Sequence, residues 1–117
     1  MADLFSVRAP LVVRLPDGSH HLSVAVFPHP AGLVYCEPVW EKHQITARTH
    51  LLAGEIQGSG PWKVGEAVVR VLGCHGTDPA LAAEYAEWQA WCHEQGRGRC
   101  PLREELEQAA RALGAEP

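Results

Sequence analysis

The sequence of 117 residues has no long apolar run, and none approaches the roughly 18 residues that a membrane-crossing helix needs. It also has no excess of bases, since 10 Lys and Arg stand against 14 Asp and Glu, for a net charge of −4. Phosphate backbones are bound by basic surfaces. The sequence therefore predicts no membrane partner and no nucleic-acid partner.

The sequence also lacks the common catalytic motifs. It contains no G-x-x-x-x-G-K, no G-x-G-x-x-G and no G-x-S-x-G segment. No pair of carboxylates stands out as a general acid and base, because most of the acidic residues fall on predicted helix faces. We therefore expect a protein that is not an enzyme, with no catalytic residues and no cofactor.

Cysteine is sparse, with four residues in the chain, which is too few for a disulfide scaffold. The N-terminal residues show no basic segment followed by an apolar one, so the sequence predicts no secretory signal. Without export, the expected location is the cytoplasm, where cysteines remain free thiols.

A single domain over residues 1–117 is expected, because the mass is 12.8 kDa and apolar residues make up 46% of the chain. Its first part, residues 1–75, is predicted to be β-rich. Apolar and polar residues alternate over 5–15, which indicates a strand that Pro10 interrupts or places at an edge. A hairpin is predicted over 11–27, around the turn Pro16–Ser19.

Further strand segments are predicted over 33–36, 44–56, 62–64 and 67–72, with Glu37 and Pro38 ending the first of them. Residues 76–117 change to helical spacing. Pro79 is at a helix start, and Gly114 is a helix stop. The first apolar stripe is Leu81, Tyr85, Trp88 and Cys92, and the second is Leu102, Leu106, Ala109 and Leu113.

These segments predict an α+β fold: an antiparallel, curved sheet or partial β-barrel of about five strands, followed by a C-terminal helical hairpin. Both an open sheet and a closed barrel fit the pattern. Two apolar helix stripes give more apolar surface than one small sheet face covers. We therefore expect a non-catalytic binding or assembly module that self-associates as a homodimer or binds another protein.

Trp62 and Trp91 are the predicted interface residues. Trp91 flanks the first helix stripe, and Trp62 follows Gly60 and Pro61 at a loop edge. For Trp62 a second interpretation is equally compatible with the sequence, in which the side chain covers the end of the sheet.

A zinc-binding protein is the first alternative, with Cys74, His75, Cys92 and Cys100 as ligands. No C-x-x-C pair occurs, and a helix over 79–95 is about 25 Å long, which separates Cys74 from Cys92. The main prediction is therefore that no metal is bound there. The second alternative is a thiol-dependent enzyme that uses Cys74 between a strand and a helix N-terminus.

Histidine is frequent, with seven residues, five of which lie between positions 20 and 50. Neither H-x-H nor H-E-x-x-H spacing occurs, and His20 and His21 are expected on opposite faces of a strand. The spacing thus favours separate, exposed strand residues over a functional cluster. A pH-responsive surface is the alternative, because histidine titrates near pH 6.5.

Overall fold

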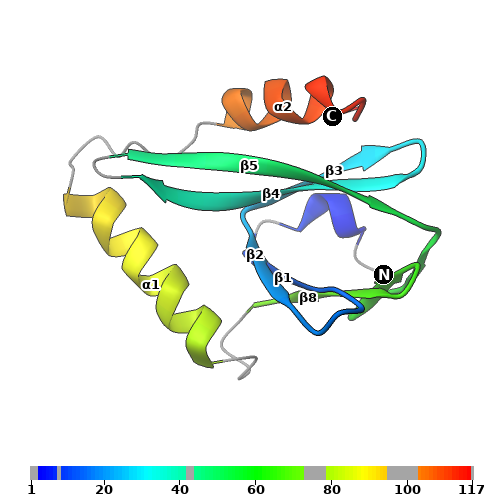
Figure 1. Ribbon diagram of the computed structural model, residues 1–117, viewed down its shortest axis with the longest axis horizontal. Helices are drawn as coiled ribbons and strands as arrows, with labels where there is room; N and C mark the ends of the chain where they lie inside the picture. The colour runs from blue at the N-terminus through cyan, green and yellow to red at the C-terminus, as the bar shows by residue number, and fades with distance from the viewer. Residues whose placement is uncertain (1–2, 8, 42–43, 73–78, 95–102, 117) are drawn as a thin grey trace.

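The computed structural model describes residues 3–7, 9–41, 44–72, 79–94 and 103–116. Within these residues the strands form two antiparallel sheets, and two α-helices follow them in the chain (Figure 1). The predicted α+β class is confirmed, and the strands form open sheets, not a closed barrel. No helix of this part of the chain is long and apolar enough to cross a membrane.

The first sheet has the strand order β2-β1-β8-β7-β6. Its strands are β1 Leu11–Arg14, β2 His20–Ser23, β6 Ile56–Gly58, β7 Trp62–Val64 and β8 Ala67–Val71. The second sheet has the order β3-β4-β5. Its strands are β3 Ala25–His29, β4 Gly32–Glu41 and β5 Gln44–Ala53. The predicted hairpin is present as β1 and β2, but after Ser23 the chain enters the second sheet.

The larger core lies between the two sheets. Val13 and Val69 from the first sheet and Leu33 and Leu52 from the second belong to one buried cluster, which also includes Trp62. Val13 pairs with Val69, and Leu33 pairs with Leu52. Because cross-strand partners share a face, each pair points from its own sheet toward the other sheet. Burial of this apolar surface is what holds the sheets together.

Residues 4–6 form a short 3₁₀ helix, η1 Leu4–Ser6, so the strand predicted from residue 5 is wrong at its beginning. Asp3 caps this turn, because its carboxylate accepts a hydrogen bond from the Phe5 N–H at 3.1 Å. Regular strand pairing starts only after Pro10, whose carbonyl accepts a hydrogen bond from the Leu72 N–H. The capping hydrogen bond to Asp3 favours the 3₁₀ turn over the strand that the alternating pattern predicts.

Strand β4 runs through Pro38, so the predicted interruption at Glu37 and Pro38 is wrong. The Cys36 carbonyl accepts a hydrogen bond from the Val24 N–H, which places the backbone groups of Cys36 on the β3 side of β4. Backbone groups alternate sides along a strand, so Pro38 faces the same way. Pairing with β3 ends at Cys36, and the missing N–H of Pro38 therefore costs no ladder hydrogen bond.

Helix α2, Arg103–Ala112, covers the second sheet on the face turned away from the first (Figure 1). Leu106 and Ala110 pack there with Phe27 and Val34. The predicted stripe is right for Leu106 but wrong for Leu113, which is 40% exposed because the helix ends at Ala112 before Gly114.

Helix α1, Pro79–Glu94, begins at the predicted proline. Its Tyr85 packs against a small cluster of Val12, Leu22 and Leu72. The two helices lie on different sides of the strands (Figure 1). Two helices follow the strands, as predicted, and residues of each helix pack on strands.

Candidate functional site

The side chains of two histidines, one tyrosine and one glutamate meet at one place between the two sheets. They are His21 from β2, Tyr35 and Glu37 from β4, and His50 from β5. Tyr35 is buried, whereas the side chains of His21, Glu37 and His50 are 24–26% exposed. We call these four residues the inter-sheet cluster.

Strand pairing places the residues of the second sheet in the cluster. Tyr35 and His50 are direct partners in the β4–β5 ladder, and their rings stack with centroids 4.8 Å apart and planes 21° apart. Glu37 lies two residues farther along β4, on the same face. Its Oε1 accepts a hydrogen bond from the His50 Nε2–H at 3.0 Å.

His21 completes the cluster from the first sheet. It is the ladder partner of the buried Val13, so its side chain points toward the second sheet. Its Nδ1 lies 2.9 Å from the Tyr35 hydroxyl and 3.9 Å from Glu37 Oε2. The cluster therefore links the two sheets through polar contacts at the margin of an apolar core.

Two carboxylates give the surroundings of the cluster a negative field. Burial raises the pKa of Tyr35 to about 12, and the charges of Glu37 and Asp17 add to this increase. The Tyr35 hydroxyl is thus neutral at physiological pH and can donate a hydrogen bond. Asp17, in the β1–β2 turn, has its pKa lowered, first by the Ser19 side-chain hydrogen bond and then by the Ser19 backbone hydrogen bond.

The chemistry available to the cluster is that of two imidazoles, one carboxylate and one phenol. One nitrogen of each histidine and one oxygen of Glu37 all lie within 4.8 Å of one another. Neutral imidazole and carboxylate are the usual ligands of zinc and of several other first-row transition metals. The same groups also form a hydrogen-bonded network that restrains the sheets.

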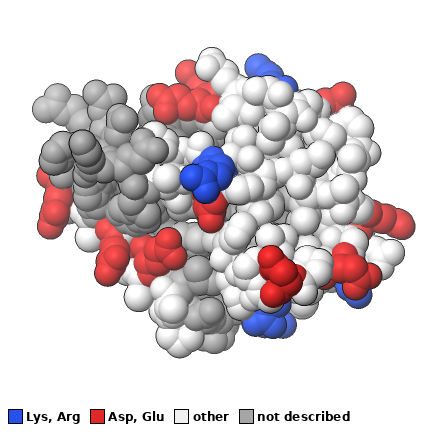
Figure 2. All heavy atoms as spheres, in the orientation of Figure 1, with Lys and Arg blue, Asp and Glu red and all other residues white. Residues whose placement is uncertain are grey.

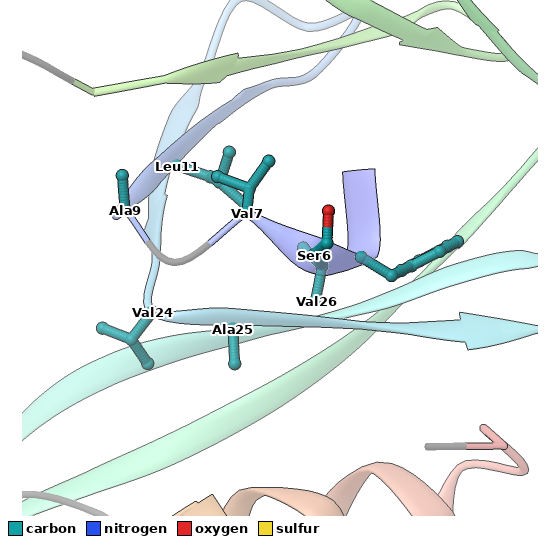
Figure 3. A pocket seen from close by; sticks show the side chains of 8 residues that line it. Ser6, Val7, Ala9, Leu11, Val24, Ala25 and Val26 are labelled. Atoms are coloured by element: carbon teal, nitrogen blue, oxygen red, sulfur yellow. The ribbon is translucent and has the colours of Figure 1, made fainter. Parts of the chain in front are cut away.

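A cavity of about 560 Å³ lies at another position, beside η1 (Figure 3). Figure 3 shows Ser6 and Val7 above the segment Val24–Val26, where the chain passes between the sheets. The described side chains that line it are mostly aliphatic, and the Ser6 hydroxyl donates to the Asp3 carbonyl at 2.8 Å. These side chains therefore offer mainly apolar contact.

The predicted interface and metal residues are only partly within the described chain. Trp62 is 4% exposed and lies in the core between the sheets. Its role in an interface stays a prediction. Cys74, His75 and Cys100, together with the side chains of Trp91 and Cys92, lie outside the described residues. The zinc and thiol-enzyme alternatives built on them also stay predictions.

Two further histidines on the strands, His20 and His29, make separate contacts. His20 accepts a hydrogen bond from Arg14 Nε at 2.9 Å, and His29 contacts the Leu113 carbonyl and the Ala31 N–H. Sequence reasoning treated His21 and His50 in the same way and missed that folding brings them together. The available signal was the alternation that puts Tyr35 and Glu37 on one strand face.

The second candidate binding feature is the outer edge of β5, where a strand of another chain could pair. This strand has 10 residues and pairs only with β4 within the described chain. The Gly54 N–H bonds to the Ala31 carbonyl, and this fixes which backbone groups face β4. By alternation, the N–H and C=O groups of Ala47, Thr49 and Leu51 face outward. We call these three residues the β5 edge.

On the face seen in Figure 2, Lys and Arg side chains appear as separate spots among uncharged and acidic residues. Comparison with protein-family models, with curated proteins and with solved structures found no match for this chain. Function must therefore be argued from the inter-sheet cluster and the β5 edge.

Proposed function

We propose that this protein is a non-catalytic binding and assembly module that forms a homodimer through the β5 edge. The observation that carries the proposal is a strand of 10 residues whose outer side pairs with no other strand in the part of the chain that the structure describes. Unpaired N–H and C=O groups on such a strand can form a ladder with a strand of another chain.

The β5 edge has little protection against such pairing. Edge strands are commonly blocked by proline, lysine or a bulge. Between Gln44 and Ala53 the only residue with a formal charge is Arg48, and there is no proline. Leu51 is 46% exposed at this edge. Burying its apolar surface against a second chain would contribute favourable free energy.

A second copy of the chain is the proposed occupant, because β5 can pair with itself in antiparallel orientation about a two-fold axis. Such an interface is closed, since each copy uses the same surface. It would extend the second sheet of each copy into one continuous sheet, with an α2 helix from each copy on the same face. The backbone groups of the β5 edge would then all find partners.

We further propose that the protein works in the cytoplasm. The low cysteine content supports this location, because four cysteines in 117 residues are too few for a disulfide scaffold. Proteins without a disulfide scaffold are compatible with the reducing conditions of that compartment. Fractionation of cells that produce the untagged chain tests this part of the proposal, and recovery in an exported fraction would contradict it.

Sedimentation velocity of two variants at the same position tests the assembly proposal. Thr49→Pro removes an outward N–H without breaking the β4–β5 ladder, as Pro38 does in β4. Thr49→Val keeps the N–H and the strand preference. We expect dimers for the wild type and Thr49→Val and monomers for Thr49→Pro. A monomeric wild type at tens of micromolar, or a dimeric Thr49→Pro, would contradict the proposal.

A further inference from the structure

We propose that His21, Glu37 and His50 form a binding site for a divalent transition metal ion of the zinc class. This site is distinct from the β5 edge, and neither proposal depends on the other. It also differs from the cysteine site considered for the sequence, because it uses no thiol.

The three ligand atoms are already close to the separation that a metal requires. Zinc–nitrogen and zinc–oxygen distances of about 2.0–2.2 Å place tetrahedral ligands about 3.3–3.5 Å apart. His50 Nε2 and Glu37 Oε1 are 3.0 Å apart, and His21 Nδ1 and Glu37 Oε2 are 3.9 Å apart. The widest separation is within 4.8 Å, so small side-chain rotations suffice to bring all three atoms to one ion.

The ligands are held in position before any ion arrives. The His50 ring stacks on Tyr35, and the His21 ring lies against both of these rings, with centroids 5.9 Å from Tyr35 and 5.4 Å from His50. The hydrogen bonds of His21 Nδ1 with Tyr35 and of His50 Nε2 with Glu37 use the nitrogens that would bind the ion, so the ion replaces these bonds and the ring packing remains. Tyr35 itself is buried, which restricts its own rotation. Residues that orient ligands in this way strengthen metal binding because less side-chain freedom is lost.

The charge of the site suits a cation. Glu37 supplies a negative charge. Asp17 lies outside the cluster, but its charge is near enough to raise the pKa of Tyr35. Arg48 opposes this field, because it is the ladder partner of Glu37, but its side chain is exposed. When the ion binds, His50 presents its Nε2 lone pair, and the proton of the neutral ring moves to Nδ1.

The site is open on one side. About a quarter of each ligand side chain is exposed, which gives an ion access from solvent. Three protein ligands leave at least one position of a tetrahedral ion for water or a small external ligand. Because His21 belongs to the first sheet and the other two ligands to the second, a bound ion would also cross-link the sheets.

Zinc titration of the full chain, followed by calorimetry, tests the site. We expect one equivalent of Zn²⁺ to bind the wild type and the affinity to fall about tenfold or more in Glu37→Gln and His50→Gln. Glu37→Gln keeps an acceptor for His50, so the fold should be retained. His20→Gln and His29→Gln are the matched controls, and we expect them to bind as the wild type does.

A variant with Cys74, Cys92 and Cys100 all replaced by serine separates this site from a cysteine site. We expect it to retain the Zn²⁺ equivalent, and amide NMR shifts on titration should be largest in β2, β4 and β5. The proposal is overturned if the wild type binds no Zn²⁺ at tens of micromolar. It is equally overturned if Glu37→Gln and His50→Gln bind as tightly as the wild type, or if the serine variant loses the equivalent.

Discussion

Tyr35 and His50 stack across the β4–β5 ladder with ring centroids 4.8 Å apart, and the same Tyr35 reaches the other sheet through His21. Tyr35 thus contacts His50 of β5 within its own sheet and links the two sheets through His21. Its burial keeps the hydroxyl neutral, with a pKa of about 12, so that it remains available as a hydrogen-bond donor.

Replacing Tyr35 by phenylalanine tests this link. The variant keeps the ring stacking but loses the 2.9 Å contact with His21, so we expect the free energy of unfolding to fall by about 1 kcal/mol. Urea denaturation measures it. Tyr85→Phe is the control, since that hydroxyl accepts an exposed hydrogen bond from Gln89 within α1 and its loss should cost about half as much or less. Equal effects would argue against a special role for Tyr35.

The packing of α2 on the second sheet gives a second prediction. Leu106 is buried against Phe27 and Val34, so Leu106→Ala should lower the free energy of unfolding by about 2–4 kcal/mol. Leu113→Ala should cost about 1 kcal/mol or less, because that side chain is 40% exposed. Thermal or chemical denaturation distinguishes the two. A loss for Leu106→Ala as small as that for Leu113→Ala would show that α2 does not dock as described.

Gly54, where the chain leaves β5 for the first sheet, should tolerate no side chain. Its φ is +142°, and an added Cβ would overlap the backbone of Gly65. We expect Gly54→Ala to destabilise the protein by about 2–4 kcal/mol. Gly18→Ala is the control, because φ is +90° but nothing lies within 4 Å, so only strain of about 1 kcal/mol remains. Similar losses of stability for both variants would contradict the close approach of the Gly54 and Gly65 backbones.

The pKa of Asp17 gives a prediction on pH dependence. Hydrogen bonds from Ser19 lower the pKa of this carboxyl below its ordinary value of 3.8. The stability it contributes is therefore complete above that value and is lost as pH falls through the lower, folded-state pKa. NMR titration should place the Asp17 pKa below 3.8, and Ser19→Ala should shift it upward. A value at or above 3.8 in the wild type would contradict the turn geometry.

The parts of the fold that depend on neighbouring residues could be predicted from the sequence. Pro79 begins α1 and Gly114 follows the end of α2, because helix starts and stops are set by single side chains and backbone preferences. The β1–β2 hairpin was predictable for the same reason, from the turn at Pro16–Ser19.

The parts that depend on strand order could not be predicted. His21 is 14 positions from Tyr35, and Glu37 is 13 from His50, and no short motif records that they meet. Their approach depends on the β4–β5 register and on the passage of the chain between sheets after Ser23, neither of which local pattern fixes. The β5 edge was hidden in the same way, since an edge is defined only by which strand is absent beside it.

Amide hydrogen exchange at the β5 edge tests the central claim most directly. The outward N–H groups of Ala47, Thr49 and Leu51 should exchange slowly at high protein concentration and much faster on dilution, because pairing with a second copy protects them only in the dimer. The His50 N–H, which faces β4, should stay protected throughout and serves as the internal control. Fast exchange of the three outward amides at every concentration would contradict assembly through this edge.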